Sequence, residues 1–501
     1  MPTVDLKGLD WEDKFFPNFG GGINIADDSE QLQDTEVIAA DNMHIVDNIL
    51  QRDSGYQTYL GLVIGKPRLV HKHVQTDGTI QTFLFTNLRM YEDLSSFWHL
   101  VSNGTATTLT ADASGGNNTV TVASIAGFTD GEPIGITLDD GTQHITTING
   151  APSGSTITLD DAFGGSGVVA TSGNAVVESI TLAGVDTEHV VAETIPWDDS
   201  VAFTNGIDTV KRFVSSTAIV GALPNLPSSG NTICKSLIVF DSSLFLINTV
   251  EGGNNFPYRT RWSDKADVTE WVTGDAGAID MLDTNHDLVT GKRLGPYLYV
   301  YRTKSIVRIV AVNTGVKRFD FTQTIDNEGI FSVYGVISLG DQHFIWGTRD
   351  FYVYTGGFDL IPVSRTIRKR VFGTKAQFDS TKASRVFMLH VEDLDEIFCF
   401  YPSTAGTDCD RMLRAHIGEI TNEFREVFVT KWTERKLANE VLGFGEAQTG
   451  GSVAWSGLIG SWIDQTWAWD SAVITLSAPN VIICGADVLQ CYAYDFLSTT
   501  D

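Results

Sequence analysis

Apolar residues in this chain fall in short runs, and most runs alternate with polar residues. The clearest run is 82–91, residues 296–309 and 343–354 repeat its pattern, and weaker copies lie at 236–247 and 386–401. Each copy reads as an alternating strand, a short polar or glycine-containing turn and a second strand. Amphipathic helical periodicity is scarce. The pattern therefore predicts an all-β protein built from repeated antiparallel hairpins.

The spacing of these hairpins indicates a repeat architecture. From Ser236 onward they recur at roughly 45 to 60 residues, close to the length of one blade of a β-propeller. A single hairpin cannot bury both faces, whereas radially stacked four-stranded sheets cover one another. We expect a β-propeller, with a β-sandwich or barrel made of the same hairpins as the alternative.

Changes in composition divide the chain into four parts. Residues 1–99 hold an N-terminal segment and the first blade. Residues 100–180 are rich in Ser, Thr and Gly and lie within a longer stretch, between Arg89 and Lys211, that has no lysine or arginine. Short alternating pieces separated by turns predict a small inserted β-domain there, with a disordered linker as the alternative. The remaining blades are expected in 181–446.

The last part, 447–501, is rich in tryptophan and includes Trp455, Trp462, Trp467 and Trp469. It ends without an identifiable closing strand, so both a natural end and a shortened chain fit the sequence.

Charge and composition exclude several classes of protein. The formal net charge is −28, from 62 acidic and 34 basic residues. Because Lys and Arg drive binding to phosphates, tight binding of nucleic acid is disfavoured. A strongly acidic surface instead lets DNA pass without being trapped, although acidity also serves solubility. No apolar run reaches membrane-span length and no secretory signal opens the chain, so we expect synthesis in a cytoplasm.

The sequence contains no recognisable catalytic or cofactor-binding set. Phosphate-binding loops and the Gly-x-Ser-x-Gly motif are absent, and the five cysteines lack metal-ligand spacing and read as reduced or buried, with one incidental pair possible. His71 and His73 alternate on one strand face, which suits a polar face better than a metal pair. Adjacent carboxylates such as Asp139 and Asp140 are typical of turns. We therefore expect no enzyme, no cofactor and no metal.

One basic run stands out in the acidic chain. Arg365, Arg368, Lys369 and Arg370 fall within six residues. We interpret them as a salt-bridging patch against an acidic neighbouring subunit. A DNA contact and a solvated surface run are the alternatives.

Two clusters of polar and aromatic residues are candidate structural motifs. In the second cluster, Trp262 and Trp271 bracket Asp264 and Asp267, so we expect a loop whose carboxylates accept backbone N–H bonds while the indoles pack. The first cluster lies near the N-terminus, and its candidate residues are Gly22, Asn24, Glu36, Asn42, Arg52, Gly55 and Tyr56.

These two clusters, in this order, resemble motifs of the tail nozzle and tail-tube (tubular protein B-like) proteins of short-tailed bacteriophages. Further similarity lies at 204–208, 329–333 and 347–354, while Asp53 stands where a proline is expected after Arg52. The resemblance implies a propeller-containing, homohexameric ring in the virion tail, assembled in the host cytoplasm beneath the head-to-tail adaptor.

The resemblance also implies partners and a task. The ring would contact other tail proteins, including fibres, and its channel would retain genomic DNA and then guide its ejection. The alternative function is a carbohydrate-binding or carbohydrate-cleaving propeller used in receptor recognition. A secreted adhesin is a third, weaker alternative.

Overall fold

The computed structural model confirms an all-β protein, with 52% of the described residues in strands and 4% in helices. The described residues are 19, 21–26, 32–33, 35–40, 42–46, 49–52, 56–94, 96–184, 189–312, 317–373, 376–417, 432–448, 479–485 and 489–494.

Four four-stranded antiparallel sheets follow one another along the chain, and in each the strands pair in sequence order. The first sheet holds β18 (Val191–Ile195), β19 (Ser200–Thr204), β20 (Lys211–Val214) and β21 (Ile219–Ala222); the second β22 (Thr232–Phe240), β23 (Ser243–Glu251), β24 (Asn254–Trp262) and β25 (Gly277–Asp280); the third β26 (Leu288–Leu294), β27 (Tyr297–Arg302), β28 (Ser305–Ala311) and β29 (Phe319–Asp326); the fourth β30 (Val336–Ser338), β31 (His343–Trp346), β32 (Phe351–Tyr354) and β33 (Ile361–Pro362).

Tight turns set the register of these hairpins. Phe240 pairs with Ser243 across a two-residue loop, and both loop residues, Asp241 and Ser242, have positive φ angles of 47° and 57°. Two positive φ angles are typical of a type I′ turn, whose twist matches that of the flanking strands. The buried faces of β22 and β23 are thereby held in register from the turn outward.

A larger sheet brings together strands from residues 56–100 and 387–494. Within it, β37 (Trp432–Gln448) and β6 (Pro67–Val74) pair in parallel, with Phe444 opposite Leu69 and Gly445 opposite Val70. Gly445 is required at this pairing, because an added Cβ would lie 1.9 Å from the carbonyl oxygen of Val70. The strands of this sheet are, in order, β34 (Phe387–Val391), β35 (Glu396–Tyr401), β36 (Cys409–His416), β37 (Trp432–Gln448), β6 (Pro67–Val74), β7 (Ile80–Thr86), β8 (Met90–Leu94) and β9 (Phe97–Leu100), with β38 (Pro479–Gly485), β39 (Cys491–Tyr494) and β5 (Tyr56–Tyr59) paired beyond β37.

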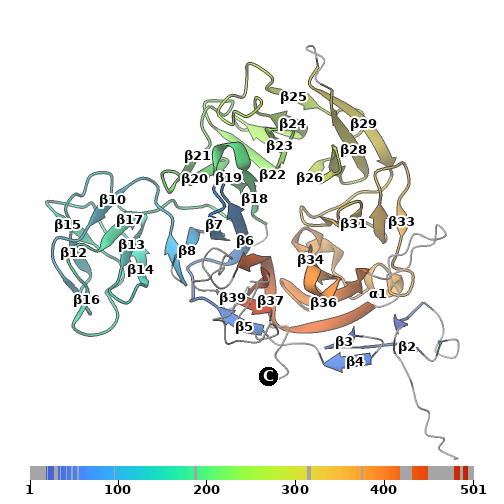
Figure 1. The fold of residues 1–501 in the computed structure, drawn as a ribbon, viewed down its shortest axis with the longest axis horizontal. Coiled ribbons are helices and arrows are strands. Elements are labelled where there is room, and N and C mark those ends of the chain that lie inside the picture. The colour runs from blue at the N-terminus through green and yellow to red at the C-terminus, as the bar shows by residue number, and fades with distance from the viewer. Residues whose placement is uncertain are drawn as a thin grey trace, which may run out of the picture.

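The sheets follow an arc in space, as Figure 1 shows. The first strands of the four four-stranded sheets, β18, β22, β26 and β30, contact one another in order, and the larger sheet contacts this row at both ends, through β6 at β18 and through β34 at β30. Apolar side chains fill the spaces between neighbouring sheets. At the junction of β18, β34 and β37, Tyr334 donates a hydrogen bond to the carbonyl of Val190 at 2.6 Å, and its ring centroid lies 4.7 Å from that of Phe444.

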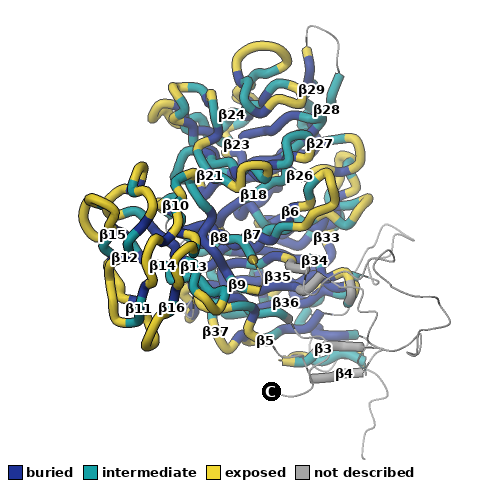
Figure 2. The backbone as a smooth tube through the Cα atoms, turned by 60° about the vertical axis from the view of Figure 1, so that its left-hand side comes forward, coloured by how far each residue is buried: buried dark blue, intermediate teal, exposed yellow. Residues whose placement is uncertain are grey.

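The expected inserted domain coincides with a separate group of short strands. It has its own buried core, and its turns are exposed where it projects from the body (Figure 2). Its two ends lie together because Ala106 pairs with Val177. The strands are β10 (Ala106–Thr108), β11 (Ala113–Ser114), β12 (Thr119–Thr121), β13 (Pro133–Thr137), β14 (Gln143–Thr147), β15 (Thr156–Thr158), β16 (Val168–Ala170) and β17 (Ala175–Glu178).

The remaining elements are short. None of the helices in the described residues is long and apolar enough to cross a membrane. These elements are β1 (Gly22–Ile23), β2 (Glu36–Val37), β3 (Met43–Val46), β4 (Ile49–Arg52), α1 (Arg368–Val371) and the 3-10 helices η1 (Pro196–Asp198), η2 (Ser380–Arg385) and η3 (Glu392–Leu394).

Candidate functional site

The first cluster of candidate residues, which we call the N-terminal motif, forms a small hydrogen-bonded unit. Gly22 and Glu36 pair in the parallel strands β1 and β2, and Gly22 has a φ of 62°, which favours glycine. The Asn24 side chain donates to Glu36 Oε1 at 2.9 Å and accepts from the backbone N–H of Ala26 at 2.9 Å. Three of the residues singled out in the sequence are therefore brought together.

Asn42 attaches this unit to strand β37. Its backbone N–H donates to the carbonyl of Glu434 at 3.0 Å, and its Oδ1 accepts from the N–H of Lys436 at 3.2 Å. Asn42 has a φ of 57°, a conformation that asparagine tolerates better than most residues. Asn42 thus acts as a backbone anchor.

The rest of the N-terminal cluster is only partly described. Arg52 ends β4 and Tyr56 begins β5, where it pairs with Tyr494 of β39. Their side chains, and Gly55 as a whole, lie outside the described residues.

The basic run surrounds α1, next to the N-terminal motif. Lys369 Nζ donates to the carbonyl of Ala26 at 2.6 Å, and Arg368 Nε lies 3.3 Å from Asp350 Oδ2. Arg370 forms an ion pair with Glu434 of β37. Two stretches separated by more than 300 residues, the N-terminal motif and the basic run, therefore meet on one side of the molecule.

Glu434 is the centre of this junction. Glu434 is fully buried, and its carboxylate accepts hydrogen bonds from Arg370 and from the Tyr401 hydroxyl. Arg411 Nη1 lies 3.9 Å from Glu434 Oε1. Burial and the adjacent carboxylate raise the pKa of Tyr401 well above its ordinary value. The buried anion is thus matched by one close cation and one neutral donor.

The exposed cations of this region form what we call the basic surface, consisting of Arg349, Arg365, Arg368 and Lys369. A cavity of about 570 Å³ is lined by the last three, together with Phe372.

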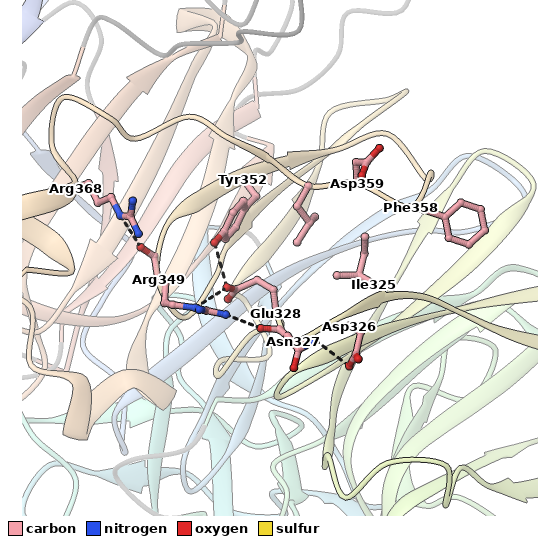
Figure 3. A pocket seen from close by; sticks show the side chains of 10 residues that line it. Ile325, Asp326, Asn327, Glu328, Arg349, Tyr352, Phe358, Asp359 and Arg368 are labelled. Atoms are coloured by element: carbon pink, nitrogen blue, oxygen red, sulfur yellow. Dashed lines mark hydrogen bonds and ion pairs between the residues drawn. The ribbon is translucent and has the colours of Figure 1, made fainter.

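A second cavity, of about 400 Å³, adjoins the first at Arg368 and is drawn in Figure 3. At its floor Glu328 accepts from the Thr348 backbone N–H at 2.7 Å, the Tyr352 hydroxyl at 3.1 Å and Arg349 Nε at 3.3 Å. The Glu328 carboxylate is held by neighbouring groups of its own chain. The exposed Arg368 at the edge of this cavity is therefore better placed than Glu328 to contact a partner.

The loop after β24 has the arrangement expected from the sequence. Asp264 Oδ1 accepts from the backbone N–H groups of Lys265 at 2.8 Å and Asp275 at 2.7 Å, and Asp267 Oδ1 accepts from that of Thr269 at 2.8 Å.

Both indoles flanking this loop pack and bond within the chain. Trp271 is buried and donates to the Val268 carbonyl at 3.0 Å. Trp262 stacks on Phe245 and donates to the Asp275 carbonyl at 2.9 Å. The loop is thus a structural feature, away from the basic surface.

His71 and His73 both contact one hydroxyl. Thr194 Oγ1 lies 3.0 Å from His71 Nε2 and 3.2 Å from His73 Nδ1. Desolvation lowers the pKa of His71 to about 4 and also lowers that of His73. Within the described ranges no group of three potential metal ligands is present.

The sequence did not predict which residues form ion pairs and hydrogen bonds with the basic run. Glu434, Asp350 and the carbonyl of Ala26 carry no local signal, because each becomes a partner only through pairing of distant segments.

Comparison with known proteins identifies no family. No protein-family model and no curated protein matches the chain. Among solved structures, PorZ, a surface component of the type-IX secretion system of Porphyromonas gingivalis, is 9% identical with a TM-score of 0.34; the match covers 89% of this chain and spans 40% of that one.

Two other structures are similarly distant. AztD from Citrobacter koseri is 12% identical with a TM-score of 0.30, over 68% of this chain and 96% of that one. Chaetomium thermophilum Raptor is 9% identical with a TM-score of 0.31, over 71% of this chain and 29% of that one. Scores of this size carry no conclusion about function.

Proposed function

We propose that this chain is a structural subunit of a bacteriophage tail nozzle or tail tube, with six copies forming a ring through which DNA is retained and then ejected. The observation that carries the proposal is the junction at β37. There the N-terminal motif, one of the two clusters on which the resemblance to tail proteins depends, packs beside the basic surface. These contacts lie within one chain and leave Arg365 exposed beside the motif, where a neighbouring copy could bind it.

The finer fold in this proposal is a β-propeller of six blade-like units. Four are the consecutive four-stranded sheets, and the other two are β6–β9 and β34–β37. Their first strands contact one another in order around the arc. The parallel pairing of Phe444 and Gly445 in β37 with Leu69 and Val70 in β6 supports this proposal, because it places the last unit beside the first.

Charge supports both the contact and the channel. A net charge of −28 gives each subunit a mostly acidic exterior, so the basic surface is complementary to many faces of a neighbouring copy. An acidic channel wall repels DNA and lets it slide without being trapped. The subunit would also bind the head-to-tail adaptor and other tail proteins, including fibres, without enzymatic activity.

The intersubunit contact is tested by reversing one exposed charge. Arg365→Glu on the basic surface should weaken ring formation about tenfold in sedimentation analysis, equivalent to about 1.4 kcal/mol. Lys304→Glu is the matched control, because Lys304 is also exposed and the change in net charge is the same. Equal behaviour of the two variants would remove the basic surface from the contact, and a wild-type chain that stays monomeric at every concentration would contradict the ring itself.

A further inference from the structure

Two buried cysteines face each other across a strand pair. Cys484 of β38 and Cys491 of β39 are directly opposite in the antiparallel register. Their sulfur atoms lie 3.3 Å apart, and the two residues are 0% and 1% exposed. Both are free thiols in this structure.

The backbone at this position suits a disulfide. The neighbouring N–H of Gly485 donates to the carbonyl of Gln490 at 2.9 Å, so the Gly485–Gln490 pair is of the hydrogen-bonded type. Because the two types alternate along an antiparallel ladder, Cys484 and Cys491 occupy a non-hydrogen-bonded pair. In such pairs the Cα atoms are about 4.5 Å apart, within the range that a disulfide spans.

The other three cysteines lie on different strands opposite different residues. Cys234 pairs with Thr249, Cys399 with Leu413 and Cys409 with Val441. Cys409 Sγ also contacts the carbonyl of Arg385 at 3.2 Å. These three thiols supply an internal comparison for the Cys484–Cys491 pair.

We propose that Cys484 and Cys491 form a disulfide when the folded protein meets an oxidising medium. With a small disulfide such as oxidised glutathione as the oxidant, one thiolate attacks the oxidant and releases one glutathione thiol. The second cysteine then attacks the mixed disulfide and releases the other. The protein loses two protons and two electrons, and the oxidant is reduced to two thiols.

The bond would tie three strands together. β39 pairs with β38 on one side and with β5 on the other, so the disulfide secures the N-terminal strand β5 through its C-terminal partner. Figure 1 labels β39 and β5 next to each other. This inference does not depend on the proposed tail function, and its test requires no ring.

Oxidation of the buried pair should be slow. Burial and the neighbouring thiol raise the pKa of Cys491 well above its ordinary value, so little thiolate is present at neutral pH. The full-length protein, purified under reductant, should therefore be incubated for hours at pH 8 with oxidised glutathione. It is then denatured in N-ethylmaleimide, and the adducts are counted by intact mass.

The expected count falls from five adducts to three, because two of the five cysteines are consumed. Cleavage at Asp487, which lies between the pair in the sequence, should release two peptides that stay joined until reduction. Cys491→Ser should keep four adducts in both states, whereas the matched Cys234→Ser should fall from four to two. Five adducts in the oxidised wild type, a persistent glutathione adduct or a different pairing would each overturn the proposal; wild-type mapping decides this even if a variant fails to fold.

Discussion

Glu434 is the single residue on which the candidate site most depends. Its carboxylate is fully buried and pairs with Arg370 of the basic run, while its backbone holds Asn42 of the N-terminal motif. A buried charge is tolerated only when it is matched, and removing one partner leaves the other uncompensated. The basic run therefore has two roles within six residues: Arg370 stabilises the fold, and Arg365 remains exposed for a partner.

The difference between these two arginines predicts their effects on stability. Arg370→Ala should lower the free energy of unfolding by about 3 kcal/mol, because it removes the closest cation from the buried Glu434 carboxylate and leaves Arg411 Nη1 at 3.9 Å. Arg365→Ala should change it by less than about 0.5 kcal/mol, as is usual for an exposed side chain. Urea unfolding of both variants measures the difference. Equal losses would contradict the role given to the Arg370–Glu434 pair.

The burial of His343 predicts that the folded protein loses stability in acid. Its Nε2 donates to the carbonyl of Arg293 at 2.8 Å, so in the neutral imidazole Nδ1 carries no proton and accepts from the Tyr301 hydroxyl at 2.6 Å. Burial lowers the pKa of His343 from 6.5 to about 4. Between these values the unfolded chain binds a proton that the folded chain does not, so stability falls as pH drops below about 6.5.

Urea unfolding at pH 7 and pH 5 measures this effect. His343 should contribute roughly 2 kcal/mol of the loss. A similar contribution comes from His189, whose pKa burial lowers to about 3. His343→Gln cannot be protonated and should show a smaller loss than the wild type. A variant with an unchanged pH dependence would contradict the assignment.

At the scale of elements, local pattern predicts the hairpins well. The runs at 82–91, 236–247, 296–309, 343–354 and 386–401 all contain antiparallel strand pairs. Their alternation and turn residues are local properties of the sequence. Pairing between distant strands has no such signal, which is why the parallel contact of β37 with β6 could not be predicted.

The same limit applies to the candidate site. The residues Asn24, Glu36 and Arg370 stand out locally as polar or basic, and the sequence therefore flags them. Their hydrogen bonds and ion pair depend on segments that lie far apart in sequence, and Glu434 is one charge among many in an acidic chain. Composition identifies the candidates, whereas only tertiary pairing identifies the partners.

The inserted element should unfold independently of the body. Its core is separate, and Ile136 is fully buried within it. Ile136→Ala should destabilise the insert by about 2–5 kcal/mol and give an earlier, separate transition in calorimetry. Val168→Ala, at a residue 51% exposed on the same domain, is the control and should change little. A single transition that shifts as a whole would show that the insert and body unfold together.

At the scale of the whole molecule, the acidity of the chain is what the proposed passage of DNA through a channel needs, because a like-charged wall does not trap DNA. The chain carries 28 more negative than positive charges, and its exposed cations at the basic surface are engaged in or available for protein contacts. Binding to phosphates requires clustered cations facing the backbone. The charge therefore disfavours tight DNA binding, in agreement with the proposed conduit.

The net negative charge predicts that the protein binds duplex DNA weakly even at low salt. In an electrophoretic mobility assay at low ionic strength, where phosphate contacts are strongest, micromolar protein should leave the duplex unshifted. A shift that disappears as salt is raised would indicate a cationic DNA-binding surface and contradict the conduit.

The central claim is that six copies of this chain form a ring in a phage tail. On this proposal the chain is encoded by a phage, and cryo-electron microscopy of that phage's virions tests the claim most directly. We expect six copies around the tail axis below the adaptor, with an open channel and with Arg365 at the contact between neighbouring copies. A tail without this chain, or single copies attached away from the axis, would contradict the account.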